Sequence, residues 1–280
     1  MKTILLLGGT RFIGRHLLEK LNTKVFDVFY FHRGVTNFAP SSNATEILGD
    51  RTKEQDIARL FSRKFDVIVD ISGEEYEMVE LAVRYSKKNQ PYYVYISSSS
   101  VYSSSPRIHD EHEIPVEQST SSYTNAKILS EKLVKDSFEK YAIVRTSKVY
   151  GPYNHIYREQ YFIDRLINNE QITLVNDPIL HFTYVDDLVE GITELISKNL
   201  SGIFNIAGKE PVRLSFFVKT IAAKLDLTPI LLWNYEADTP LTNLPTCVLS
   251  VQKMKNTCGW EPHYSLEEGL NHTLRQLKGK

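Results

Sequence analysis

The sequence contains few cysteines and no long hydrophobic run. Its 280 residues include only Cys247 and Cys258, which are too few for a disulfide framework or a thiolate metal cluster. No stretch approaches the roughly 18 apolar residues of a transmembrane helix, and the apolar start at residues 4–7 ends too soon for a signal peptide. We therefore expect reduced thiols, no membrane association and a cytoplasmic location.

An excess of charge of either sign is also missing. The 33 Lys and Arg residues oppose 34 Asp and Glu residues, for a net charge of -1, so no global basic character draws the chain to nucleic acid or anionic lipid. Hydrophobic residues at 42% and charged residues at 24% are ordinary for globular proteins and exclude collagen-like, coiled-coil and disordered chains. The length allows one large domain or two modest ones.

Short apolar runs alternate with helical patterns through the first half of the chain. This alternation is typical of parallel βαβ units, which predicts an α/β fold with a doubly wound, Rossmann-type parallel sheet. Ligands of such folds bind at the carboxyl ends of the strands. The predicted strands are residues 4–7, 25–31, 45–48, 67–71, 92–96 and 142–145, and the predicted helices are residues 12–18, 53–62, 76–85 and 123–138.

The alternation breaks at Gly151 and Pro152. Beyond this point we expect a smaller, mostly helical lobe, with helices at residues 160–167, 186–197, 216–225 and 266–277 and a short strand at 203–206. The sequence thus predicts a dinucleotide-binding domain over residues 1–151 and a substrate-binding lobe over residues 152–280. The segment around residues 181–208 is expected to return to the first domain.

The first predicted strand ends in a glycine turn that opens a helix. Such a turn presents backbone N–H groups and the positive end of the helix to a dinucleotide pyrophosphate. Arg11 stands where this motif has its middle glycine, and a purely structural turn remains the alternative. The expected cofactor contacts in the turn are Gly8, Thr10, Arg11, Phe12, Ile13 and Gly14.

Arg33 follows the second strand, where an NAD site usually has an acidic residue. Arg33 and Arg11 could clamp a 2′-phosphate, which favours NADP(H) as the cofactor, with NAD as the alternative. Asp50, after the third short strand, could accept a hydrogen bond from adenine or simply form a turn. Its neighbour Arg51 completes the predicted cofactor site.

Tyr123 and Lys127 form the clearest chemical pattern. Four residues apart on a predicted helix, they lie on one face, where the ammonium would lower the pKa of the phenol. Tyr123 would then act as an acid or base near neutral pH. Such pairs also occur on ordinary helices, but Ser98 directly follows the predicted strand 92–96, where its hydroxyl could bind the same substrate oxygen.

These residues resemble the extended branch of the short-chain dehydrogenase/reductase superfamily, the NAD(P)-dependent epimerase/dehydratase family. Residues 96–102 (ISSSSVY) are similar to its SSxxVY segment, and residues 145–152 (RTSKVYGP) to its RxxxVYGP segment. The resemblance covers nearly the whole chain. It implies hydride transfer at nicotinamide, with Tyr123 moving the proton, Lys127 holding the ribose hydroxyls and Ser98 orienting the substrate.

The variant glycine turn and residues 49–51 (GDR) are closer to a subgroup that includes chloroplast stem-loop RNA-binding proteins and bacterial relatives. We expect an NADP(H)-preferring oxidoreductase, epimerase or dehydratase acting on a nucleotide-sugar-like or related carbonyl or alcohol substrate. The alternative is an RNA-binding or regulatory protein without turnover. A homodimer is left open, and no metal site is expected. The predicted substrate contacts are Ser99, Tyr150, Asn154, Arg158 and Arg213.

Overall fold

A seven-stranded, fully parallel sheet forms the centre of the protein in the computed structural model, which describes residues 1–21, 24–41, 43–105, 107–234 and 244–278. The strand order is β11-β7-β5-β4-β1-β2-β3. The chain adds strands on one side of β1 as far as β3 and then, from β4, on the other side, so the topological switch point of this doubly wound sheet lies between β1 and β4. The predicted fold class is therefore confirmed. The strands are β1 (Lys2–Leu7), β2 (Phe26–His32), β3 (Thr45–Leu48), β4 (Val67–Asp70), β5 (Tyr92–Ile96), β7 (Tyr141–Thr146) and β11 (Gly202–Ile206).

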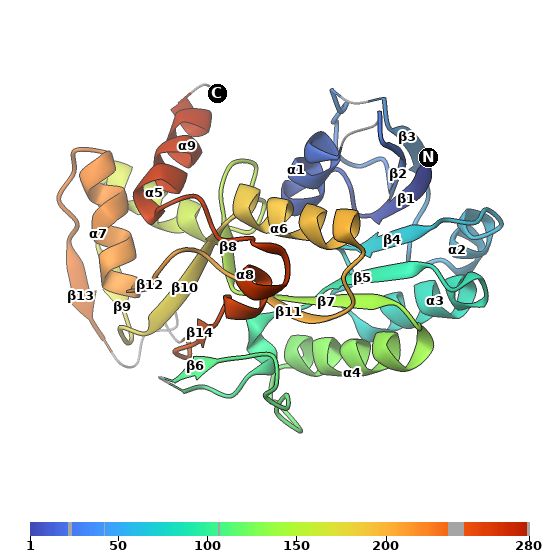
Figure 1. Cartoon of the computed structure of the whole chain (residues 1–280). Coiled ribbons are helices and arrows are strands. Elements are labelled where there is room, and N and C mark those ends of the chain that lie inside the picture. Colours follow the sequence, from blue (N-terminus) through green and yellow to red (C-terminus); the bar gives the residue numbers. More distant parts are fainter. Residues whose placement is uncertain (22–23, 42, 106, 235–243, 279–280) are drawn as a thin grey trace.

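Helices cover both faces of this sheet (Figure 1). Alternate residues of one strand pack on opposite layers: Leu6 contributes to the core beneath α1 (Phe12–Lys20) and α6 (Val185–Lys198), whereas Leu5 contributes to the opposite core. That second core lies under α2 (Glu54–Leu60), α3 (Tyr76–Ser86) and α4 (Ser122–Ser137). Burial on both faces explains why the strands appear in the sequence as continuous apolar runs.

The last strand of the sheet comes from far along the chain. β11 pairs in parallel with β7, and α6, which precedes it, packs on α1. Trp260, after the short helix α8 (Gln252–Cys258), is buried in the same core as α6. Segments between residues 185 and 260 thus complete the sheet and one of its helical layers.

The second lobe holds helices α5 (Glu159–Ile167), α7 (Leu214–Lys224) and α9 (Leu266–Lys278), which lie together beside the large sheet (Figure 1). Outside the central sheet, the chain has more strands than the sequence predicts, because segments of two to six residues show too little periodicity to be recognised. They form three small sheets from β6 (Ile108–His109), β8 (Lys148–Tyr150), β9 (Ile172–Leu174), β10 (Ile179–Tyr184), β12 (Pro211–Arg213), β13 (Leu231–Trp233) and β14 (Val248–Leu249).

None of the helices in the described part of the chain combines the length and the apolar character needed to cross a lipid bilayer. Cys247 and Cys258 are both free thiols, the first of them buried.

Candidate active site

Two adjoining cavities open at the carboxyl ends of the central strands. The larger, of about 1030 Å³, lies between the sheet and the second lobe, and we call it the reaction cavity. The smaller, of about 490 Å³, lies along the ends of β1, β2 and β3, and we call it the dinucleotide cavity. Both are lined by Phe12, Ile71, Glu74 and His155, so one elongated ligand could occupy the two together.

The glycine turn forms one wall of the dinucleotide cavity. Gly8 adopts a φ of +101°, which a side chain rarely tolerates, and its N–H donates to the carbonyl oxygen of Phe31 at 3.1 Å. A Cβ at Gly14 would overlap the carbonyl oxygen of Gly8, so only glycine lets α1 pack this closely on the turn. Thr10, Arg11 and the turn's other predicted residues line or support this wall. The turn therefore fits a pyrophosphate.

Three polar side chains predicted to bind the adenosine half line the dinucleotide cavity: Arg11, Arg33 and Asp50. Nε of Arg11 donates to Oγ1 of Thr36 at 3.0 Å, and its terminal nitrogens make no hydrogen bond to the residues that the structure describes, so they can bind a ligand. Hydrogen bonds from the N–H and hydroxyl of Thr52 lower the pKa of Asp50, so this carboxylate stays ionised and can accept a further hydrogen bond.

Arg51 lines the dinucleotide cavity. Its guanidinium binds the buried carboxylate of Asp70 through hydrogen bonds of 2.6 and 2.9 Å. It donates further to Oγ of Ser72 and to the carbonyl oxygen of Met78. These four hydrogen bonds use both terminal nitrogens, so Arg51 supports the cavity floor, and its role as a cofactor ligand stays a prediction.

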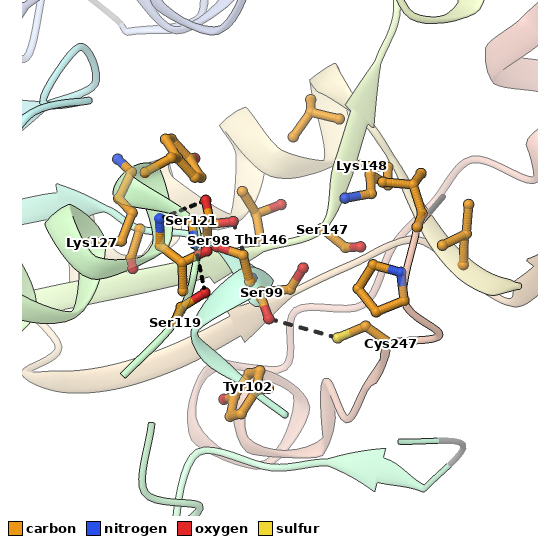
Figure 2. A pocket seen from close by; sticks show the side chains of 18 of the residues that line it. Ser98, Ser99, Tyr102, Ser119, Ser121, Lys127, Thr146, Ser147, Lys148 and Cys247 are labelled. Carbon is orange, nitrogen blue, oxygen red and sulfur yellow. Dashed lines mark hydrogen bonds between the residues drawn. The ribbon is translucent and has the colours of Figure 1, made fainter. Parts of the chain in front are cut away.

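Ser98, Tyr123 and Lys127 all line the reaction cavity. Figure 2 shows Ser98 and Lys127 there. Ser98 is the second residue after β5, and its Oγ accepts a hydrogen bond from the N–H of Ser100 at 3.1 Å. Ser121 caps α4 by accepting from the N–H of Thr124, which fixes the helix start that carries Tyr123. The phenol ring of Tyr123 is 43% exposed and therefore accessible from the cavity.

Lys127 is buried and already has partners. Its Nζ donates to the carbonyl oxygens of Gly73 and Ile96, each at 2.8 Å, and lies 5.5 Å from the ring centroid of Tyr123. Burial lowers the pKa of Lys127 to about 8. An ammonium has three N–H donors, so one of them remains for a ligand such as a ribose hydroxyl.

The pKa of Tyr123 is raised, contrary to the expected lowering by Lys127. Partial burial and the carboxylate of Glu74 raise it, whereas Ser98 and the guanidinium of Arg158 oppose that rise. The ammonium of Lys127 is turned toward two carbonyl oxygens, which explains why it does not dominate the phenol. Without a ligand, Tyr123 is therefore a protonated donor at neutral pH.

A buried polar network holds the serine segment in place. Oγ of Ser97 donates to Glu131 at 2.5 Å, and Arg145 binds the same carboxylate, with its shortest bond from Nη2 at 2.7 Å. The guanidinium of Arg145 lies 4.8 Å from the ring centroid of Tyr102, whose hydroxyl donates to Asn205 at 2.8 Å. This network joins α4, β7 and β11 beneath Ser98, so the hydroxyl is presented by a rigid support.

The predicted substrate residues fall into two groups. Ser99 and Arg158 line the reaction cavity, but the other three do not. Tyr150 is buried among the rings of Phe182, Tyr184 and Phe217. We therefore correct Tyr150 to a core residue, as its position at the end of a buried strand requires.

Asn154 and Arg213 are likewise corrected. Nδ2 of Asn154 donates to both carboxylate oxygens of Glu159, an interaction that shapes the loop before α5. Arg213 is exposed at the end of β12, where it donates to the backbone carbonyl oxygen of Asp177. Neither residue forms part of the wall of the reaction cavity.

Several residues of the reaction cavity were not predicted from sequence, notably Glu74, Lys148, His155 and Cys247. Glu74 and Lys148 each follow a central strand by only a few residues, so their position at the carboxyl edge of the sheet was a usable signal. Cys247 comes from a segment far along the chain from the central strands, and no local pattern could reveal it. Within the described residues, no cluster of three or more His, Cys, Asp or Glu side chains could hold a metal.

Comparison with known proteins matches residues 4–207 to the model of the NAD dependent epimerase/dehydratase family. The chain is 29% identical over 297 residues to the chloroplast stem-loop binding protein of 41 kDa b from Arabidopsis thaliana, an alignment of 96% of this chain and 77% of the relative. It is 24% identical to UDP-glucuronic acid decarboxylase 1 from Xenopus tropicalis, over 99% of this chain and 72% of the relative.

Two solved structures share the fold. One is the UDP-glucose 4-epimerase of Thermus thermophilus in complex with NAD, with a TM-score of 0.85, 20% identity and 99% coverage of each chain. The other is the UDP-glucuronic acid 4-epimerase of Bacillus cereus with UDP-glucuronic acid and NAD, with a TM-score of 0.84, 20% identity and 99% coverage of each chain. Both similarities extend over the central sheet and the second lobe.

Proposed function

The chain belongs to the NAD-dependent epimerase/dehydratase family and is an enzyme of that type, and we propose that it binds NADP(H) in preference to NAD(H) and acts on a nucleotide-sugar-like substrate. The observation that carries this proposal is the meeting of the two cavities at Phe12, Ile71 and Glu74. A dinucleotide along the glycine turn would extend from one cavity into the other.

The cofactor preference rests on charge. Arg11 and Arg33 both line the dinucleotide cavity, and two guanidinium groups suit the dianionic 2′-phosphate of NADP(H) better than a ribose hydroxyl. Asp50 stays ionised and lines the same cavity, which supports a role in accepting a hydrogen bond from the adenosine half. The bound nicotinamide would supply hydride transfer to or from a carbon of the substrate.

Ser98, Tyr123 and Lys127 would perform the proton chemistry. The Tyr123 phenol, protonated at neutral pH, would donate its proton to the substrate oxygen, and the resulting phenolate would take a proton back in the reverse direction. The hydroxyl of Ser98 would orient that oxygen. Lys127 would hold the ribose through the N–H that its two carbonyl partners leave unused. The size of the reaction cavity, about 1030 Å³, suits a sugar joined to a nucleotide.

Calorimetric titration with NADP+ and NAD+ tests the cofactor assignment. We expect Arg11→Met and Arg33→Met each to weaken NADP+ binding about tenfold or more, since a charge-assisted hydrogen bond contributes roughly 1.5–3 kcal/mol. NAD+ binding should change less than threefold. Lys64→Met, an exposed lysine in the loop between α2 and β4, is the matched control. Equal affinity of the unaltered protein for both cofactors, or binding of neither, would contradict the proposal.

Binding of stem-loop nucleic acid is a second candidate because the similar Arabidopsis protein is named for it. It would leave the reaction cavity without a role, and we rank it below the enzyme. Stem-loop binding that survives Tyr123→Phe, in a protein that binds neither cofactor, would reverse this ranking.

A further inference from the structure

Lys148 brings a positive charge into the reaction cavity that the mechanism above does not use. It stands at the start of β8, half-buried, and lines the cavity on the side opposite Lys127, with Ser98, Thr146 and Ser147 between them (Figure 2). Within the described part of the chain, its ammonium has neither an ion pair nor a hydrogen bond, whereas most buried ammonium groups have both.

Arg158 places a second cation against the same wall. Its Nη1 donates to the carbonyl oxygen of Val149 at 2.5 Å, and its Nε is buried without a hydrogen-bond partner among the described residues. The neighbouring carboxylate of Glu159 does not satisfy it, because that group accepts from the N–H of Gly151 and from Asn154. The guanidinium is therefore fixed in position and only partly satisfied.

The two cations repel each other, and the pKa values of both are lowered. Burial, followed by the guanidinium of Arg158, lowers the pKa of Lys148 to about 8, so the amine is still mostly charged at neutral pH. Burial also lowers the pKa of Arg158. Glu159 offsets part of the charge of Arg158, whereas Lys148 has no ion pair among the described residues. Two like charges so incompletely neutralised in a partly buried wall destabilise the fold, and they are typical of a site that binds an anion.

The rest of the cavity wall fits an anionic ligand. Among the described residues that line it, Glu74 is the only carboxylate, and Glu74 lies at the junction with the dinucleotide cavity. Hydroxyl groups from residues 97–100, 119–121 and 146–147 form much of the remaining wall and can donate hydrogen bonds. Arg158 also interacts electrostatically with Tyr123, so an anion bound here would lie close to the reacting atoms.

We propose that Lys148 and Arg158 form an oxyanion subsite of the reaction cavity, which selects substrates that carry a carboxylate or phosphate group near the atoms served by Tyr123. The inference rests on the proposed function only in that it concerns the same cavity. Lys148 is then a specificity-determining residue, and the fold tolerates its unpaired charge for the sake of substrate recognition.

Titration of the cofactor-free protein with inorganic phosphate and with D-glucuronate tests the subsite directly. We expect binding in the millimolar range, weakened about tenfold by Lys148→Met and by Arg158→Met and restored to within about threefold by Lys148→Arg. Lys88→Met, an exposed lysine after α3, should leave binding unchanged. Lys148→Met should also unfold at the same or a higher denaturant concentration, which separates lost recognition from a damaged fold.

A second titration identifies the anion. Lys148→Met should weaken UDP-glucuronate more than UDP-glucose if the subsite binds a sugar carboxylate, and should weaken both compounds and UDP equally if it binds the diphosphate. Either result supports an oxyanion subsite. Unchanged phosphate and D-glucuronate affinities in Lys148→Met, or no binding of either anion to the unaltered protein, would overturn it.

The two proposals fail separately. If the protein binds phosphate through Lys148 but binds neither NADP+ nor NAD+, the subsite is supported and the proposed function is contradicted. If the protein binds NADP+ but Lys148→Met leaves every anion affinity unchanged, the proposed function is supported and the subsite is contradicted.

Discussion

Arg51 binds Asp70 through two hydrogen bonds, from Nη1 to Oδ1 at 2.6 Å and from Nη2 to Oδ2 at 2.9 Å. Asp70 is fully buried at the end of β4, and the hydroxyl of Tyr93 donates to the same carboxylate. The pair lies directly beneath the dinucleotide cavity, so it links the stability of the fold to the shape of the site.

Removing one member of this pair should be costly. We expect Arg51→Met to lower the free energy of unfolding by about 3–5 kcal/mol, because it leaves a buried carboxylate without its counterion. Denaturant unfolding measures the change. The double variant Arg51→Met/Asp70→Leu should recover part of the loss, and a loss below about 1 kcal/mol in Arg51→Met would contradict the structural role.

Tyr123→Phe should separate catalysis from binding. We expect kcat to fall by about 10²–10⁴, because the proton donor is lost, while NADP+ affinity stays within about twofold. Steady-state kinetics with the nucleotide sugar that the protein turns over, together with calorimetry, provides both values. Tyr141→Phe, at the start of β7, is the matched control. Undiminished turnover by Tyr123→Phe would disprove the assignment.

Gly14→Ala should weaken cofactor binding strongly. The added methyl group would overlap the carbonyl oxygen of Gly8 and push α1 away from the turn. We expect NADP+ affinity to fall about 100-fold or more, since the N–H groups of the turn would no longer converge on the pyrophosphate. Gly259→Ala is an informative control: its φ of +75° makes it strained, yet nothing lies within 4 Å of the new Cβ, so it should lose stability and keep cofactor affinity.

Stability should fall as the pH drops below neutrality, and His181 should be one cause. Its Nδ1 accepts from the N–H of Leu249 and its Nε2 donates to the carbonyl oxygen of Gly208, a pattern that only the neutral ring can form. Burial lowers the pKa of His181 to about 4 from an ordinary 6.5. The unfolded chain therefore binds the extra proton first, and the contribution of His181 is complete above pH 6.5 and lost by pH 4.

This pKa difference corresponds to about 3 kcal/mol over that window. Denaturant unfolding at several pH values between 4 and 7 measures it. His181→Gln should flatten the pH dependence, whereas His112→Gln, an exposed histidine, should not. A pH profile of His181→Gln that matches the unaltered protein would refute the assignment.

The sequence predicts the central sheet well because its strands are buried on both faces. Runs such as residues 92–96 are continuous and apolar, and β5 has the predicted bounds. The short strands of the second lobe were missed, because β8, β9, β12 and β13 have three residues each and their pairing depends on contacts distant in sequence.

The candidate site was predictable where a residue directly follows a strand. Ser98 and the glycine turn lie within two residues of a strand end and were predicted; Lys148 meets the same condition but was missed. Side-chain direction was not predictable: Arg51 turns to Asp70 and Tyr150 turns into the core, although both stand beside the site in sequence. Local pattern locates a backbone position, whereas the partner that a side chain finds depends on the whole fold.

β11 is the last strand of the central sheet to be translated, which affects the nascent chain during protein synthesis. A ribosome that has translated only the first 151 residues has produced six of the seven strands, but β7 still lacks its neighbour and the face under α6 is bare. Residues through Ile206 must emerge before that edge is closed. The nascent chain therefore exposes an open strand edge and apolar surface during elongation, a state in which chaperones bind and in which truncated products aggregate.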